Sequence, residues 1–307
     1  MDRLHQMRVF VAVADESGFA AAARRLGMSA PAVTRAVASL EQTLGVKLIK
    51  RTTRHLRVTE AGYRYLHDVR RILDEVAAAD EAAAGLDATP RGRLAITAPV
   101  MFGRMFVLPG VVDYLRRYPQ MQVDTVFLDR VVSLLEEGLD VGVRIGEIPD
   151  SSMRAIRVGQ VRMMLVASPA YLEQHGQPET LEQLNQHTLI ASRAGNFSNH
   201  WRLGNPGNER LVRIEPRLTV TTNDAAVSAA QQGLGVTRAI SYQVADELES
   251  GTLKSLLTDC TPPPLPIHIA HRDDRNPPAK VRAFIDLLAD KLRNDPALMP
   301  SLTNAED

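Results

Sequence analysis

The chain has 307 residues, a length typical of two domains. Its composition, with 45% hydrophobic and 23% charged residues, is that of a soluble globular protein, and no apolar run of about 18 residues indicates a membrane span. The single cysteine, Cys260, excludes an internal disulfide and a zinc site built from several cysteines. The N-terminal segment lacks an apolar core of signal-peptide length, so we expect a cytoplasmic protein.

Basic residues are concentrated in the first part of the chain, although the net charge of the whole is zero. Residues 1–60 contain ten Lys and Arg and five Asp and Glu, so this stretch carries +5 and the remainder −5. Such an imbalance indicates a polyanionic partner for the first part. An uneven distribution that arose by chance is the alternative explanation.

Three helices are predicted within the first 45 residues. Residues 4–14 carry apolar side chains at helical spacing, and an alanine-rich helix follows that Ser17 can cap and Gly27 can end. Ser29 can cap the next helix, and Gly45 can end it. Two helices separated by a tight glycine turn predict a helix-turn-helix motif, whereas the alternative is an ordinary helical hairpin inside a core.

The helix that follows Ser29 has two different faces. Val33 and Val37 lie on an apolar side, while the opposite side carries one arginine among small residues. Such a sparse face can enter the major groove, because alanine can approach thymine methyl groups and Thr34 and Arg35 supply hydrogen-bond donors. The residues expected to contact DNA are Ser29, Ala30, Pro31, Ala32, Thr34 and Arg35.

A basic hairpin is predicted after this helix, with extended runs at residues 47–49 and 55–58 around a turn. No acidic residue interrupts residues 42–59, so the hairpin suits DNA phosphates or the minor groove. We expect contacts with DNA from Lys50, Arg51 and Arg54.

A long helix is predicted over residues 59–89, and residues 88–93 read as a hinge because they contain Pro90 and Gly92. Heptad-like spacing of apolar residues favours a helix that pairs with a second copy. The alternative is a helix packed on its own domain. The expected dimer contacts are Leu66, Val69, Leu73 and Val76.

Strand-like and helix-like segments alternate over residues 93–293, which predicts an α/β architecture. Extended runs such as "RLAITA" are followed by helical runs such as "LPGVVDYLRRYP", and the last helix is "PAKVRAFIDLLADKL". Residues 294–307 show no periodicity, so we expect a mobile tail there.

The stretch "GFAAAARRLGMSAPAVTRAVASLEQTLGVKLIKRTTRHLRVTEAG" resembles the DNA-binding domain of the LysR-type transcriptional regulators. The resemblance implies a winged helix-turn-helix domain at residues 1–58 and a dimerising linker helix at 59–89. Three positions depart from the family pattern. Ala30 stands where glutamine is frequent, Thr34 where serine is common, and Ile49 where phenylalanine is usual.

The second part, with "RIGEIPDSS", "VASPAYLEQHG" and "VTTNDAAVSAAQQGLGV", is similar to the effector domain of the same family. The resemblance implies a two-subdomain fold like that of type II periplasmic binding proteins over residues 90–293. Subdomain I would comprise residues 91–162 and 267–293, and subdomain II residues 163–266. An effector would bind in the cleft between them.

Residues 98–103 are predicted to be a strand end that opens into a helix, where free backbone N–H groups can hold a carboxylate. Arg144 and Arg238 are candidate charged partners for such an acid, and the alternative for each is a structural salt bridge, with Asp140 and Asp224 as candidate partners. The full set expected to bind an effector is Ala98, Pro99, Val100, Met101, Phe102, Arg144 and Arg238.

No constellation of catalytic residues stands out in the sequence. The pair Gly233 and Gly235 is only a fragment of a nucleotide fingerprint, and His268 and His271 are three apart on a predicted strand and face opposite sides, so no cofactor or metal is expected. We therefore expect a bacterial regulator that binds operator DNA as a homodimer or homotetramer and responds to an organic acid. The alternatives are an enzyme on a binding-protein fold and a DNA-binding protein without a ligand.

Overall fold

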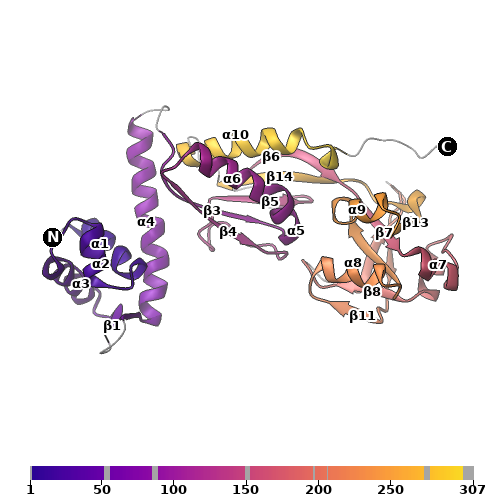
Figure 1. Cartoon of the computed structure of the whole chain (residues 1–307), viewed down its shortest axis with the longest axis horizontal. Coiled ribbons are helices and arrows are strands. Elements are labelled where there is room, and N and C mark those ends of the chain that lie inside the picture. The colour runs from indigo at the N-terminus through magenta and orange to yellow at the C-terminus, as the bar shows by residue number, and fades with distance from the viewer. Residues whose placement is uncertain are drawn as a thin grey trace. The chain divides into compact units, whose positions relative to one another are not determined.

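The computed structural model describes residues 2–51, 56–84, 89–148, 153–195, 198–205, 207–272 and 277–299. The chain forms two compact units, Met1–Gly92 and Arg93–Asp307, each with its own hydrophobic core (Figure 1). Within the described ranges, no helix combines the length and the apolar character that crossing a membrane would need.

The first unit contains four helices and a hairpin in its described residues: α1 (Arg3–Asp15), α2 (Phe19–Arg25), α3 (Ala30–Leu44), β1 (Ile49–Arg51), β2 (Leu56–Val58) and α4 (Glu60–Ala84). The side chain of Ser29 accepts a hydrogen bond from Ala32 N at 3.3 Å, which confirms the predicted cap of α3. Gly27 and Gly45 have φ of 63° and 67° and end α2 and α3 as expected. Ser17 does not cap α2, because Gly18 occupies that position.

The core of the first unit lies where α1 and α2 pack on α3. The apolar side of α3 is buried there, through Val33, Ala36, Val37 and Leu40. Small side chains on α2, Ala22 and Ala23, allow the helices to approach closely. The predicted division of α3 into a buried side and an exposed side is therefore confirmed.

Two of the residues expected to pair across a dimer are covered by their own chain. Val69 has 0% of its surface exposed, and Leu66 belongs to the core of the first unit together with residues of α1. The expectation is therefore wrong for Leu66 and Val69, because the same spacing also suits a helix packed on its own domain. Leu73 and Val76, farther along α4, are half-buried.

The second unit contains two five-stranded sheets in its described residues. The first sheet has the strand order β4-β3-β5-β14-β6, formed by β3 (Gly92–Ala98), β4 (Met121–Phe127), β5 (Val141–Ile145), β6 (Met153–Val161) and β14 (Leu265–Arg272). The second sheet has the order β11-β8-β12-β7-β13, formed by β7 (Met163–Ala167), β8 (Leu189–Ser192), β11 (Leu218–Val220), β12 (Val236–Ile240) and β13 (Lys254–Leu256). A separate hairpin pairs β9 (His200–Leu203) with β10 (Arg210–Arg213).

Helices accompany each sheet, and we name each sheet with its helices a subdomain (Figure 1). The first subdomain has α5 (Val100–Phe102), the π-helical turn η1 (Gly103–Val107), α6 (Leu108–Arg117) and α10 (Ala279–Arg293). The second has α7 (Pro169–His175), α8 (Asn223–Gln231) and α9 (Ala245–Glu249), with 3₁₀ turns at Glu182–Gln186, Ser241–Gln243 and Thr258–Cys260. The predicted mixture of helices and strands is thus confirmed.

The chain passes from one sheet to the other between β6 and β7, at Arg162. The backbone of Arg162 is held by Ser241, whose N–H donates to the Arg162 carbonyl at 2.8 Å and whose hydroxyl accepts from the Arg162 N–H at 3.2 Å. The return connection leads into β14, which starts at Leu265.

The first residues after α10 are ordered rather than mobile. Pro296–Leu298 form a 3₁₀ turn, and the side chain of Leu298 is 0% exposed within the core of the first subdomain. Its carbonyl lies so close to Gly159 of β6 that a Cβ there would be 2.8 Å away. The expectation of a mobile tail is therefore wrong for 294–299, and the rest of that tail lies outside the described residues.

Candidate nucleic-acid interface and ligand site

The outer face of α3 is open at the surface of the first unit. Ser29, Ala30, Pro31 and Arg35 are exposed, whereas Ala32 and Thr34 are half-buried. Within the described part of the chain, Arg35 has no ion pair, so its guanidinium is available to a partner. The structure therefore presents the six residues expected from the sequence on one side of α3, although Ser29 also serves as its cap.

The β1–β2 hairpin carries basic residues in register. Lys50 lies opposite Arg57 in the antiparallel pair, and both side chains are exposed. Like charges directly opposite each other on a hairpin are unfavourable unless an anion lies between or above them. Arg51 belongs to β1 by its backbone, while its side chain, like the whole of Arg54, lies outside the described residues.

Glu41 connects the hairpin to α3, a role that the sequence pattern did not reveal. Its carboxylate is 7% exposed and accepts hydrogen bonds from the N–H groups of Leu48 and Ile49 at 2.9 and 3.1 Å. Lys47 Nζ lies 2.5 Å from the second oxygen. Burial alone would raise the pKa of Glu41, but the hydrogen bonds from Lys47, Ile49 and Leu48 outweigh burial and hold the pKa below its ordinary value.

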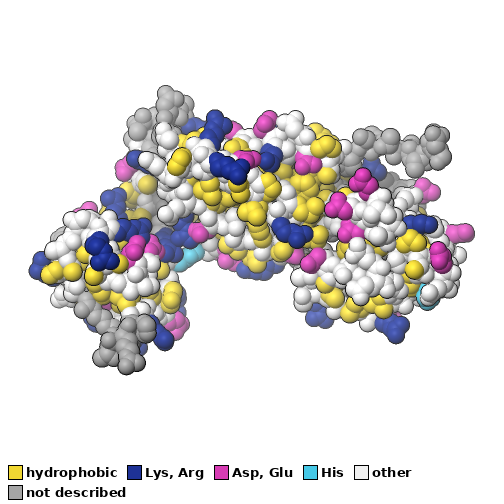
Figure 2. Space-filling model, viewed as in Figure 1, with side chains coloured by type: hydrophobic (Ala, Val, Ile, Leu, Met, Phe, Trp, Pro, Cys, Tyr) yellow, Lys and Arg dark blue, Asp and Glu magenta, His cyan; other side chains and the backbone are white. Residues whose placement is uncertain are grey.

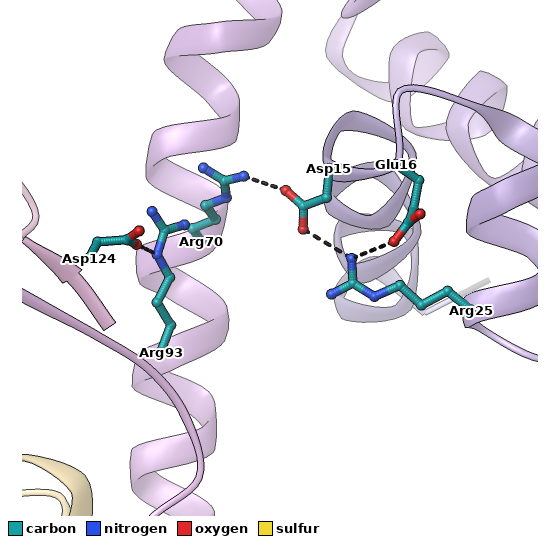
Figure 3. Close-up of polar contacts among 6 residues, drawn as sticks. All are labelled: Asp15, Glu16, Arg25, Arg70, Arg93 and Asp124. Atoms are coloured by element: carbon teal, nitrogen blue, oxygen red, sulfur yellow. Dashed lines mark hydrogen bonds and ion pairs between the residues drawn. The ribbon is translucent and has the colours of Figure 1, made fainter. Parts of the chain in front are cut away.

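Ion pairs join three helices of the first unit (Figure 3). Asp15 at the end of α1 accepts from Arg25 of α2 at 3.3 Å and also from Arg70 of α4, and Glu16 pairs with Arg25 at 3.3 Å. Pairs this exposed add little to stability. They connect α4 to α1 and α2 at the surface of the first unit.

The turn at residues 98–103 uses the backbone donors of Val100, Phe102 and Gly103 within the protein, and Gly103 N–H donates to the Pro99 carbonyl at 2.7 Å. Val100 N–H donates to Asp129 Oδ1 at 3.0 Å. Burial raises the pKa of the Tyr242 hydroxyl, as does the nearby charge of Asp129, and a backbone hydrogen bond from Phe102 partly offsets the rise. The expectation that this turn holds an effector carboxylate on free N–H groups is therefore wrong for Val100 and Phe102, because side chains of the protein already engage them.

Several residues of this turn are also inaccessible. Ala98 and Phe102 have no exposed surface. The Phe102 ring packs against Tyr242 of the second subdomain, with centroids 5.4 Å apart and an edge-to-face angle of 88°. The accessible part of the predicted set is Pro99, Val100 and Met101. The turn therefore belongs mainly to the contact between the two subdomains.

Arg144 has a structural position in the first subdomain. Its guanidinium donates to the carbonyls of Val143 at 3.3 Å and Val132 at 3.1 Å, and burial lowers its pKa. Asp140, one of the two candidate salt-bridge partners, instead accepts from Ala95 N at 2.8 Å. Neither an effector role nor the proposed salt bridge is supported for Arg144 by these contacts.

Arg238 lies on β12 of the second sheet, and burial lowers the pKa of its guanidinium. Its Cζ lies 5.7 Å from the centre of the Trp201 ring. In the ranges that the structure describes, no carboxylate pairs with it, and Asp224, the other candidate salt-bridge partner, hydrogen-bonds to Thr222. A half-buried guanidinium that rests on an aromatic ring and has no acid among the described residues can take an anion as its partner.

The face of β12 that carries Arg238 extends to the first subdomain. Side chains alternate along a strand, so Arg238 and Ile240 share one face. Ile240 packs against the core of the first subdomain. The Arg238 side chain therefore lies on the side of the second sheet that leads to the boundary between the subdomains.

Among the described residues, no group of three or more His, Cys, Asp or Glu side chains could hold a metal ion.

Comparison with known proteins covers nearly the whole chain. Residues 4–63 match the model of the "Bacterial regulatory helix-turn-helix protein, lysR family", and residues 87–293 match that of the "LysR substrate binding domain". The chain is 30% identical over 295 residues to the HTH-type transcriptional regulator CrgA of Neisseria meningitidis serogroup B, covering 94% of this chain and 97% of CrgA. It is 32% identical over 292 residues to the HTH-type transcriptional activator AaeR of Escherichia coli, covering 94% of each.

Solved structures show the same extent of similarity. The full-length structure of the Vibrio cholerae virulence activator AphB superposes with a TM-score of 0.59 at 28% identity and covers 94% of this chain and 99% of its own. The structure of CrgA from Neisseria meningitidis gives a TM-score of 0.60 at 28% identity, with 96% of this chain and 100% of CrgA covered.

Proposed function

Since the chain belongs to the LysR family of DNA-binding transcriptional regulators, which have an effector-binding domain, we propose that it reads a partly palindromic operator with the outer face of α3. The observation that supports this proposal is that the outer face of α3 is exposed and carries mostly small side chains, with Arg35 as its one cation. The β1–β2 hairpin supplies contacts with phosphates through Lys50 and Arg51. The protein acts in the cytoplasm and has no catalytic role.

Assembly as a homodimer or homotetramer uses two surfaces. The second half of α4 offers the half-buried Leu73 and Val76 for pairing with a second copy. A second surface is the exposed apolar stripe of Met105, Leu108 and Val112 on η1 and α6, where hydrophobic side chains reach the surface (Figure 2). Two separate contacts of this kind allow dimers to join into tetramers on DNA.

The effector is a small organic acid bound between the two subdomains. Support comes from Arg238, whose half-buried guanidinium has no acid among the described residues and lies beside Trp201. Pro99, Val100 and Met101 provide accessible apolar contacts on the other subdomain. Binding at this boundary would change how the subdomains are held and hence how dimers are arranged on the operator.

Selection of bound duplexes from a random DNA pool by the full-length protein tests the operator proposal. The expected product is a pair of inverted half-sites whose centres are about 34–36 Å apart, one turn of DNA, or a multiple of it. Enrichment of no sequence, with binding that depends only on salt, would instead indicate a DNA-binding protein without operator specificity.

A further inference from the structure

Asp129 lies in the loop after β4, where the first subdomain meets the second. Its carbonyl would be 3.4 Å from a Cβ added to Gly195, which follows β8 of the second sheet. Its charge also contributes to raising the pKa of Tyr242, which belongs to the second subdomain. Two independent neighbours from the other subdomain thus place Asp129 at the boundary.

The carboxylate of Asp129 is only partly used by the protein. Oδ1 accepts from Val100 N–H at 3.0 Å, and in the described part of the chain Oδ2 has no hydrogen-bond partner. An ionised carboxylate accepts on both oxygens, with about four lone-pair directions. The half-buried Asp129 therefore keeps acceptor capacity that a hydrogen-bond donor can fill.

Arg238 provides the opposite requirement from the second subdomain, since no acid among the described residues pairs with its guanidinium. Tyr242, whose hydroxyl lies within the influence of the Asp129 charge, is four residues after Arg238, and four extended residues span at most about 13 Å. Arg238 and Asp129 therefore belong to opposite sides of the same boundary between the subdomains. A molecule complementary to both carries a negative group at one end and a donor at the other.

A plain carboxylic acid satisfies only half of this arrangement. Its acid group suits Arg238, but an acid placed at the 98–103 turn would lie beside the Asp129 carboxylate, and two neighbouring like charges repel. A hydroxyl or ammonium group at that point would instead donate to Asp129 Oδ2.

We propose, on the premise of the effector site above, that the effector is a carboxylic acid with a hydroxyl or amino substituent. The acid pairs with the Arg238 guanidinium, and the substituent donates to Asp129. Asp129 is then the specificity-determining residue of the site. A substituted acid donates a hydrogen bond to its carboxylate, whereas a plain acid leaves that carboxylate without a donor and therefore binds more weakly.

The test uses the full-length protein and acids matched in skeleton: propanoate with lactate and alanine, and benzoate with salicylate and 2-aminobenzoate. Calorimetry measures affinity for each. Within at least one set, a substituted acid should bind at least tenfold more tightly than its plain counterpart, the size expected for one hydrogen bond to a charged group. Asp129→Asn should abolish this preference while keeping an oxygen for Val100 N–H. Asp246→Asn, which removes the same charge from an exposed position on α9, should leave the preference unchanged.

Equal affinities for plain and substituted acids in the wild-type protein would overturn the role of Asp129 and leave the acid effector in place. A preference that survives Asp129→Asn would do the same. If no acid of either kind binds, the acid effector fails together with this inference, while operator binding, measured separately on DNA, still stands or falls by itself.

Discussion

Replacing Glu41 should detach the hairpin from α3. In Glu41→Ala, the N–H groups of Leu48 and Ile49 lose their buried acceptor. A buried donor without a partner costs about 1–3 kcal/mol, so the two together should lower the free energy of unfolding by about 2–6 kcal/mol. Glu41→Gln keeps an oxygen for both donors and loses only the charge and the Lys47 pair, so a smaller loss of about 1–2 kcal/mol is expected.

Urea denaturation of the full-length protein measures the change, with Glu60→Ala as the matched control. Glu60 is 88% exposed and, among the described residues, pairs with Arg64 alone on its own helix, so its loss should cost less than about 1 kcal/mol. Glu41→Ala should also lower the salt slope of DNA binding by about one for each phosphate that the hairpin no longer neutralises. A Glu41→Ala variant that is as stable as Glu60→Ala and binds DNA with the wild-type salt slope would show that Glu41 does not hold the hairpin.

Stability should also depend on pH through Glu41. Its folded pKa lies below the ordinary value of 4.5, so its contribution is complete above about pH 4.5 and is lost as the pH falls through the folded value. The difference in unfolding free energy between wild type and Glu41→Gln should therefore shrink in acid below that pH. A difference that stays constant from pH 7 down to pH 3 would contradict the assignment.

Three further predictions concern other parts of the chain. Leu73→Asp should produce monomers with near wild-type stability, whereas Val69→Ala should lower the free energy of unfolding by about 2 kcal/mol at any protein concentration, because Val69 is buried by its own chain. Light scattering and denaturation at two protein concentrations separate these two effects. A Leu73→Asp variant that remains dimeric would disprove the role of α4 in dimer formation. Arg238→Gln should weaken binding of the effector acid at least tenfold while leaving operator binding without effector unchanged, and retained affinity with a lowered melting temperature would show a purely structural arginine. Burial, and to a lesser extent the charge of His175, lowers the pKa of His187. The contribution of His187 to stability is therefore complete above about pH 6.5 and is lost as the pH falls toward the folded pKa. His187→Gln should flatten the fall in melting temperature between about pH 7 and pH 5, and a pH profile identical to that of the wild type would contradict this role of His187.

Local signals made the first unit predictable. Ser29 as a cap, Gly27 and Gly45 at left-handed positions, and the stripe of Val33 and Val37 each express a rule that acts over a few residues. Such rules place helices and decide which side faces the core. The alternation of strands and helices predicted the α/β architecture of the second unit in the same way.

Contacts between distant residues were the part that the sequence could not specify. Asp129 engages Val100 across 29 positions, and neither residue carries a local sign of the other. Leu66 and Val69 have the spacing of a dimer seam, but that spacing is equally suited to packing against the same chain. Leu298 lies in a segment after α10 that shows no periodicity, yet this one leucine is placed where it fills a gap in the core of the first subdomain.

Reading of the operator by α3 is the central claim, and the most direct measurement compares binding-site preferences of Arg35→Ala with those of Arg8→Ala. Both changes remove one exposed cation from the first unit, but only Arg35 lies on the outer face of α3. Arg35→Ala should cost about 1–3 kcal/mol at the selected operator and relax the preference at one base pair of each half-site, while Arg8→Ala keeps the profile. An unchanged profile for Arg35→Ala, or an equal loss from Arg8→Ala, would contradict the account.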